Sequence, residues 1–147
     1  MKFRLIVDPT VPEEVVATVH SRSNLTDQLE TLILEYTGSD GIQALGEDEW
    51  VRLRFYQIEC ITVQNGKTYA IDQAGKSYRL KQRLYELEQL LPTYFIRINK
   101  SALANENRLE RFVATYSGGI NARFLSGYEE YVSRRCFAII KRRFDSK

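Results

Sequence analysis

FIRINKSALAN, the segment from Phe95 to Asn105, says more about the architecture than any other part of the chain. Its first half alternates apolar and polar side chains, which predicts a β-strand over residues 94–98. The strand runs directly into a cluster of hydrogen-bonding side chains, Asn99, Lys100 and Ser101. Residues 101–104 no longer alternate, and we expect a short helical or turn segment there. The pattern is typical of a rigid strand that presents a polar loop.

Most of the chain around this segment also has β patterning. The predicted strands before it cover residues 50–55, 58–64, 67–72 and 77–80, and Asn65-Gly66 is a strong hairpin signal. A helix is predicted over 83–91, where four leucines share one face and Pro92 ends the pattern. Three further strands are expected at 108–116, 120–125 and 128–132, followed by a terminal helix that Ser133 caps and that ends near Arg143.

The first 40 residues have a different pattern and predict a small separate unit. Residues 2–7 and 15–20 favour two strands, and the segment from Ser23 to Gly38 favours a helix. The helix places Leu25, Leu29, Leu32 and Ile33 at helical spacing. The sequence therefore predicts an α+β, mainly β chain, with a β-β-α unit over 1–40 and a second domain over 42–147. Gly38 to Gly41 and the acidic run 47–49 are interpreted as turn or linker.

Charge divides the chain in the same way. Residues 1–49 hold three basic and ten acidic side chains, a net charge of −7, whereas residues 50–147 hold eighteen basic and nine acidic ones, a net charge of +9. A basic module favours nucleic acid, because neutralised phosphates release counterions. The alternative is that these are ordinary solvated faces.

Composition excludes several classes of protein. With 147 residues, 44% of them hydrophobic, the chain is suited to one good core or two small ones. It has no apolar run near the ~18 residues of a membrane span and no signal-peptide pattern, so we expect a soluble, cytoplasmic protein. A single histidine and two distant cysteines, Cys60 and Cys136, make a zinc site or nucleophilic catalysis improbable. We expect no enzymatic activity, no metal, no cofactor and no small-molecule substrate, and interpret Cys60 as a small buried hydrophobe.

A second strand end repeats the layout of the first. Residues 131–135, YVSRR, place Ser133, Arg134 and Arg135 directly after a strand. Lys and Arg recognise guanine edges or phosphates, and Asn recognises adenine. The two strand ends therefore predict a surface that binds DNA.

These two segments, in this order and separation, resemble the LytTR DNA-binding domain of bacterial transcription regulators. The resemblance covers about residues 45–145 and rests on three motifs: LYELEQLL at 84–91, FIRINKSALAN at 95–105 and YVSRR at 131–135. Two positions depart from the family pattern: Asn99 stands where many members have His, which leaves the base preference open, and Ala104 stands where Val is usual.

The resemblance implies an elongated, mostly β domain with short helices whose loops enter successive major grooves of repeated duplex sites. It also implies a homodimer, control by a small membrane protein as antagonist, and, in a small stand-alone member, no receiver domain. Asn105 is expected to be structural. The DNA-binding candidates are Lys67, Thr68, Asn99, Lys100, Ser101, Ser133, Arg134 and Arg135.

The leading hypothesis is a sequence-specific DNA-binding transcriptional regulator of a bacterial cell. The alternative is a protein-interaction module, in which the acidic unit binds a partner and the basic half reads no DNA. An RNA-binding protein is a weaker alternative, because no aromatic pair of the RNP type stands on one strand.

Overall fold

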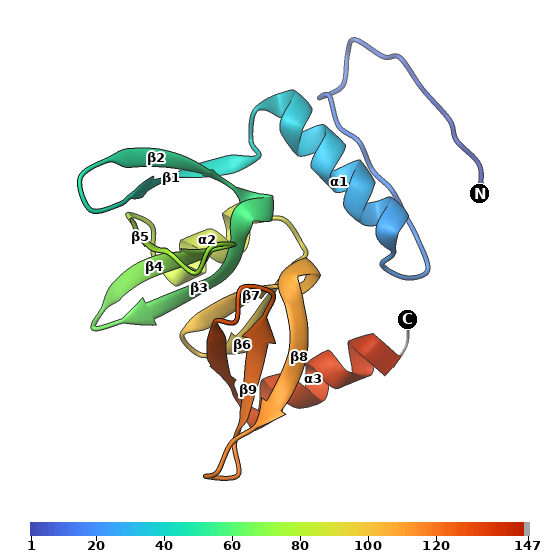
Figure 1. Cartoon of the computed structure of the whole chain (residues 1–147). Helices are drawn as coiled ribbons and strands as arrows, with labels where there is room; N and C mark the ends of the chain where they lie inside the picture. Colours follow the sequence, from blue (N-terminus) through green and yellow to red (C-terminus); the bar gives the residue numbers. More distant parts are fainter. Residues whose placement is uncertain (146–147) are drawn as a thin grey trace.

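The computed structural model describes residues 1–145, in which two antiparallel β-sheets and three α-helices form a mainly β structure (Figure 1). The predicted fold class is confirmed. The last two residues of the expected second domain, 146 and 147, lie outside the described part of the chain. The larger sheet has the strand order β2-β1-β5-β4-β3-β7-β6, and the smaller one has the order β10-β9-β8.

Most strands lie where the alternation predicts them. The larger sheet consists of β1 (Gly41–Leu45), β2 (Trp50–Arg54), β3 (Ile58–Gln64), β4 (Lys67–Asp72), β5 (Ser77–Leu80), β6 (Phe95–Asn99) and β7 (Ala102–Asn105). The smaller sheet consists of β8 (Leu109–Ala114), β9 (Ile120–Phe124) and β10 (Glu129–Val132), and the helices are α1 (Asn24–Thr37), α2 (Leu84–Leu90) and α3 (Arg134–Asp145). The acidic run 47–49 lies in the turn between β1 and β2, where the Gly46 N–H donates to the Glu49 carbonyl.

The hairpin at Asn65-Gly66 fixes the register of β3 and β4. Both residues have positive φ, 53° and 75°, as the tightest two-residue hairpin turns require. Gln64 pairs with Lys67 directly across this turn. Asparagine and glycine tolerate the left-handed region better than other residues, which explains why the sequence signal was reliable.

Strands β3, β6 and β7 of the larger sheet are covered on both faces, whereas β2 and β5 expose one face. One core packs α2 against the sheet through Leu84, Leu87 and Leu91. The other core packs the opposite face against the smaller sheet and α3, through Phe124, Val132 and Ile140 among others. Alternate residues of β6 and β7 therefore enter different cores.

The expectation of a helical or turn segment at 101–104 was wrong, because Ala102–Asn105 forms strand β7 between β3 and β6. All four of its residues are buried. Since both faces of this strand are covered, its sequence does not alternate between apolar and polar, and alternation was the signal that the prediction used. Asn105 is structural, as expected: its amide donates to the Ile58 carbonyl and accepts from the Asn107 N–H, each at 2.9 Å.

The two strands expected at 2–7 and 15–20 do not form. Residues 1–23, all of which the structure describes, contain no strand, and their apolar side chains are exposed. Of the expected β-β-α unit only the helix α1 is present. A strand needs a neighbour for its backbone hydrogen bonds, and this segment lies beside no sheet edge (Figure 1).

Residues 41–145, which contain all the strands, are called the β-domain below. Helix α1 is attached to this β-domain mainly by polar contacts. Thr93 donates through its N–H and its hydroxyl to the Glu30 carboxylate, at 2.6 and 2.7 Å. Leu34 packs against the core that contains α2. Arg22, just before α1, lies 3.9 Å from the carboxylate of Glu106, which also pairs with Arg143 of α3 at 3.1 Å.

The two cysteines should differ in reactivity. Cys60 is fully buried in β3, and burial raises the pKa of its thiol well above the ordinary value, with the charges of Glu130 and Glu59 acting in the same direction. Cys136 is only half-buried. We expect a thiol reagent to modify Cys136 alone in the folded protein and both residues in denaturant, as counted by mass spectrometry. Equal rates of modification in the folded protein would contradict the burial of Cys60.

Candidate nucleic-acid interface

Three loops meet along one end of the larger sheet. Strand β3 is antiparallel to β7, with Thr62 opposite Ala102, so the β3–β4 turn lies beside the β6–β7 turn. The Val63 N–H donates to the Ser101 carbonyl at 2.9 Å and ties these two turns together. The β3–β4 pair and the β7–β6 pair are two strand spacings apart, about 10 Å.

The third loop follows strand β10 of the smaller sheet and lies beside the first two loops. The Ser133 N–H, at the junction of β10 and α3, donates to the Ile98 carbonyl at 2.9 Å. The two sequence motifs, about 35 residues apart, therefore lie side by side. Together the three loops bring the predicted residues to this end of the larger sheet. We call the surface formed by the β3–β4 turn, the β6–β7 turn and the β10–α3 junction the basic edge.

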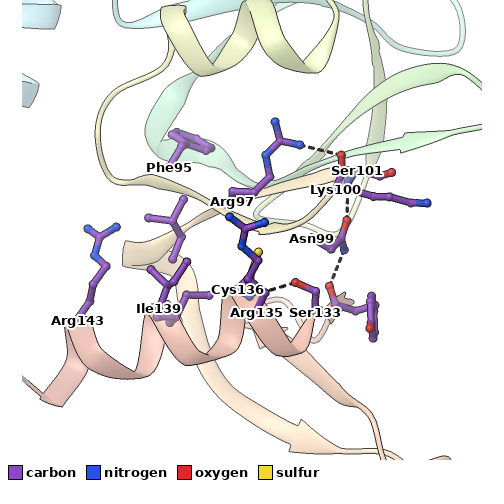
Figure 2. A pocket seen from close by; sticks show the side chains of 13 residues that line it. Phe95, Arg97, Asn99, Lys100, Ser101, Ser133, Arg135, Cys136, Ile139 and Arg143 are labelled. Atoms are coloured by element: carbon purple, nitrogen blue, oxygen red, sulfur yellow. Dashed lines mark hydrogen bonds between the residues drawn. The ribbon is translucent and has the colours of Figure 1, made fainter.

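Asn99 holds the second and third loops together. Its amide nitrogen donates to the Tyr131 carbonyl at 2.6 Å, and its amide oxygen accepts the Ser101 N–H at 2.7 Å (Figure 2). The side chain is buried. DNA contact by Asn99 stays a prediction; in the structure both polar atoms of its side chain make hydrogen bonds that hold the loop carrying Lys100.

Three more predicted residues are buried or half-buried: Ser133, Thr68 and Ser101. The Ser133 hydroxyl accepts the Cys136 N–H at 3.1 Å and so caps α3, as the sequence predicted. Thr68 is buried within β4, so it does not expose its side chain. Ser101 is half-buried, and its backbone carbonyl holds β3.

Four of the predicted residues are exposed cations. Lys67 follows the β3–β4 turn, Lys100 lies in the β6–β7 turn, and Arg134 and Arg135 begin α3. Lys100 and Arg135 also line a groove between β6 and α3, together with Arg97, Tyr131 and Arg143 (Figure 2). Arg134 is not among the residues that line this groove within the described chain.

Sequence reasoning missed the contribution of Arg97 to this site. One of its terminal nitrogens donates to the Lys100 carbonyl at 2.7 Å, and its Nε donates to Glu88 of α2 at 2.7 Å. Arg97 therefore fixes the backbone of the Lys100 loop against α2. The alternation within FIRIN was a usable signal, because an arginine between the two isoleucines that enter the second core, Ile96 and Ile98, must point away from that core.

A buried carboxylate at the other end of β3 from the loops links the two sheets. Glu59 of β3 is 0% exposed and accepts from Arg108 Nε at 3.1 Å. It also accepts from the Ser126 N–H at 3.2 Å and from the Ser126 hydroxyl. Because Ser126 lies between β9 and β10, this cluster sets the position of the smaller sheet relative to the larger one.

The edge is suited to binding polyanions. Its exposed donors are cationic, and guanidinium and ammonium groups bind phosphates and guanine edges. Within residues 1–145, no group of three His, Cys, Asp or Glu side chains is arranged to hold a metal ion. None of the helices in the described chain is long and apolar enough to cross a membrane.

Comparison with solved structures agrees with this architecture. The fold is similar to that of the LytTr DNA-binding domain of a methyl-accepting/DNA response regulator from Bacillus cereus, with a TM-score of 0.63 and 21% sequence identity. The match covers 71% of this chain and 96% of that one.

Sequence comparison finds regulators of Staphylococcus aureus. An uncharacterized HTH-type transcriptional regulator of strain NCTC 8325 is 39% identical over 70 residues, and the aligned part spans about half of each protein, 48%. A second, from the bovine strain RF122, is 29% identical over 146 residues, 97% of each chain. In the structure, α2 and α3 are separated by the five strands β6 to β10 and do not form a helix-turn-helix.

The comparison with protein families covers most of the β-domain. Residues 48–145 match the LytTr DNA-binding domain, and this range contains all three loops of the basic edge. The chain belongs to the LytTR family of DNA-binding domains.

Proposed function

We propose that this protein is a cytoplasmic transcriptional regulator that binds specific duplex DNA sites through the basic edge. The observation that carries the proposal is that four exposed cations, Lys67, Lys100, Arg134 and Arg135, come from three loops at one end of the sheet. The relatives are named as transcriptional regulators, which supports the same reading.

The edge has the dimensions to reach into a groove. Its first two loops are about 10 Å apart, close to the ~12 Å width of the major groove. The loops are held by side-chain hydrogen bonds of Asn99 and Arg97 to their backbone carbonyls, so their cations are positioned before DNA binds. Preorganised side chains lose less entropy on binding, which favours specific contacts over diffuse attraction.

The regulator is proposed to act as a homodimer on repeated sites. A single edge of this size contacts few base pairs, and two linked domains combine their affinities through effective concentration. The acidic N-terminal unit, residues 1–40, is kept off the DNA, because its three basic and seven acidic side chains give it a net charge of −4, which repels phosphate. No catalytic step is part of this function.

Selection of bound duplexes from a random pool tests DNA binding and gives the preferred site in one experiment. With that site, the logarithm of the binding constant should fall against the logarithm of salt concentration with a slope of about −5 to −7, for about five to eight phosphate contacts. A flat salt response, or no enriched sequence, would rule out the DNA-binding function and leave the protein-interaction alternative.

A further inference from the structure

Helix α1 exposes an apolar stripe along its whole length. Leu25, Leu29, Leu32 and Tyr36 are 43%, 39%, 60% and 84% exposed. Their spacing of four, three and four residues places them on one line along the helix. Among the residues of α1, all of which the structure describes, none is buried.

The stripe points away from the domain to which α1 is attached. Glu30 and Leu34 make the contacts with the β-domain, through Thr93 and the core. At 100° per residue, Leu34 lies on the opposite side of the helix from the stripe. The β-domain of the same chain therefore leaves the stripe uncovered.

The spacing and charge of the stripe fit a second copy of the same helix as the partner. Apolar residues that alternate at intervals of three and four pack against another helix with the same repeat. The four positions that flank the stripe are Thr26, Gln28, Ile33 and Glu35. With one charge among them, two copies can meet without strong repulsion, and in an antiparallel pair each Glu35 lies near the N-terminal turn of the other helix, where a negative charge is favourable.

The N-terminal segment extends the same surface. It runs on the outer side of α1 (Figure 1), and Phe3, Leu5, Val7, Val15 and Val16 are exposed along it. A stable interface needs about 800 Å² from each partner, which the four stripe side chains cannot supply alone. Residues 2–7 and 15–20 have strand-like sequences without a neighbour, and a second copy offers the same unpaired backbone.

We propose that residues 1–36 form a homodimer interface, in which the α1 stripe of one chain packs antiparallel on the stripe of a second copy. Residues 1–36 hold three basic and six acidic side chains, and this net charge of −3 disfavours DNA and anionic lipid as occupants. The proposal deepens the proposed function by naming the surface that joins two DNA-binding domains. It rests on that function only for the comparison of half-site and two-copy-site binding below.

Sedimentation of the full chain without DNA tests the interface directly. The unaltered chain should be dimeric at tens of micromolar, and the double variant Leu29→Glu, Leu32→Glu should be monomeric, because it places four like charges in the contact. Asn24→Glu adds a charge to an exposed position of α1 outside the stripe and should remain dimeric. A monomeric unaltered chain would overturn the proposal, and so would a double variant that stays dimeric.

Cross-linking tests the geometry in a chain that keeps an apolar stripe. Leu32→Cys, made together with Cys136→Ser, should form an interchain disulfide under mild oxidation, since positions near the middle of an antiparallel pair meet their own copies. Asn24→Cys in the same background should remain mostly unlinked. Equal linking at both positions would contradict the antiparallel stripe contact.

DNA binding separates this proposal from the proposed function. The double variant should bind a single half-site within twofold of the unaltered chain, yet lose at least tenfold in affinity for a two-copy site. If sedimentation shows the dimer but no DNA binds, the interface stands and the DNA function fails. If DNA binds but the chain is monomeric, the interface fails, and a docked membrane protein becomes the better occupant for the stripe.

Discussion

Replacing Arg108 with alanine should lower the free energy of unfolding by about 3 kcal/mol, because it leaves the Glu59 carboxylate buried without its cation. Arg108 Nε lies 3.1 Å from Glu59, whose side chain is 0% exposed, while that of Arg108 is 23% exposed. The hydrogen bonds from Ser126 remain in the variant, so the loss should fall at the low end of the range for a broken buried pair. Urea unfolding followed by circular dichroism measures it.

The control for this variant is Arg111→Ala, three residues further along. Arg111 pairs with Glu110, but that pair is exposed, with side chains 62% and 32% accessible. Removing it should cost no more than about 1 kcal/mol. A second variant, Glu59→Gln combined with Arg108→Ala, should lose less than Arg108→Ala alone, since no charge is then left buried. Equal losses in Arg108→Ala and Arg111→Ala would show that the Glu59 cluster does not hold the two sheets together.

The strands that the sequence predicted well are those with a local signal. Between Trp50 and Leu80, alternating side chains and the Asn65-Gly66 turn define each strand to within about a residue. The three strands of the smaller sheet also lie where they were predicted, although the first was predicted to end two residues beyond the end of β8. In these segments the information lies within ten residues of each strand, which is what a single sequence can supply.

Two errors had the same physical origin, which is that a strand depends on what lies beside it. Ala102–Asn105 is a strand because β3 and β6 flank it and both of its faces are covered, although its sequence does not alternate. Residues 2–7 and 15–20 alternate or are β-branched, yet no strand edge lies beside them in a single chain. Residues 2–7 and 15–20 have high β-propensity and form no strand, whereas residues 102–105 have low β-propensity and form one. In both cases the presence or absence of a neighbouring strand decided the outcome.

The sequence placed Lys100, Arg134 and Arg135 after two strand ends, and the structure brings these strand ends together, but the sequence did not indicate what the neighbouring side chains contact. The sequence did not indicate that the Asn99 amide is held by the Tyr131 carbonyl, because that bond joins residues 32 positions apart. Nor did it indicate that Thr68 faces inward, although an alternating strand allows only two orientations.

Arg134→Ala and Arg135→Ala should have different effects on DNA binding, because the two side chains leave α3 in different directions. Arg135 lines the groove beside Lys100, whereas Arg134 stands outside it at the exposed start of the helix. We expect Arg134→Ala to cost about 1 to 3 kcal/mol, roughly a five- to 150-fold loss in affinity, and to relax the preference at one base pair. Arg135→Ala should weaken binding to all sequences evenly and reduce the salt slope by about 1.

Lys100→Ala tests the neighbouring loop, and Lys76→Ala is its matched control. Lys76 is exposed in the β4–β5 turn, at the opposite end of β4 from the basic edge, so its removal changes the net charge equally without touching the edge. Lys100→Ala should therefore weaken binding at least fivefold more than Lys76→Ala does. Titrations of the selected duplex and of single-base variants, at one salt concentration, separate loss of readout from loss of general attraction. If Lys100→Ala, Arg134→Ala and Arg135→Ala all bind like Lys76→Ala while remaining folded, the contact surface lies elsewhere on the domain, because the β6–β7 turn and the start of α3 would contribute nothing beyond their charge.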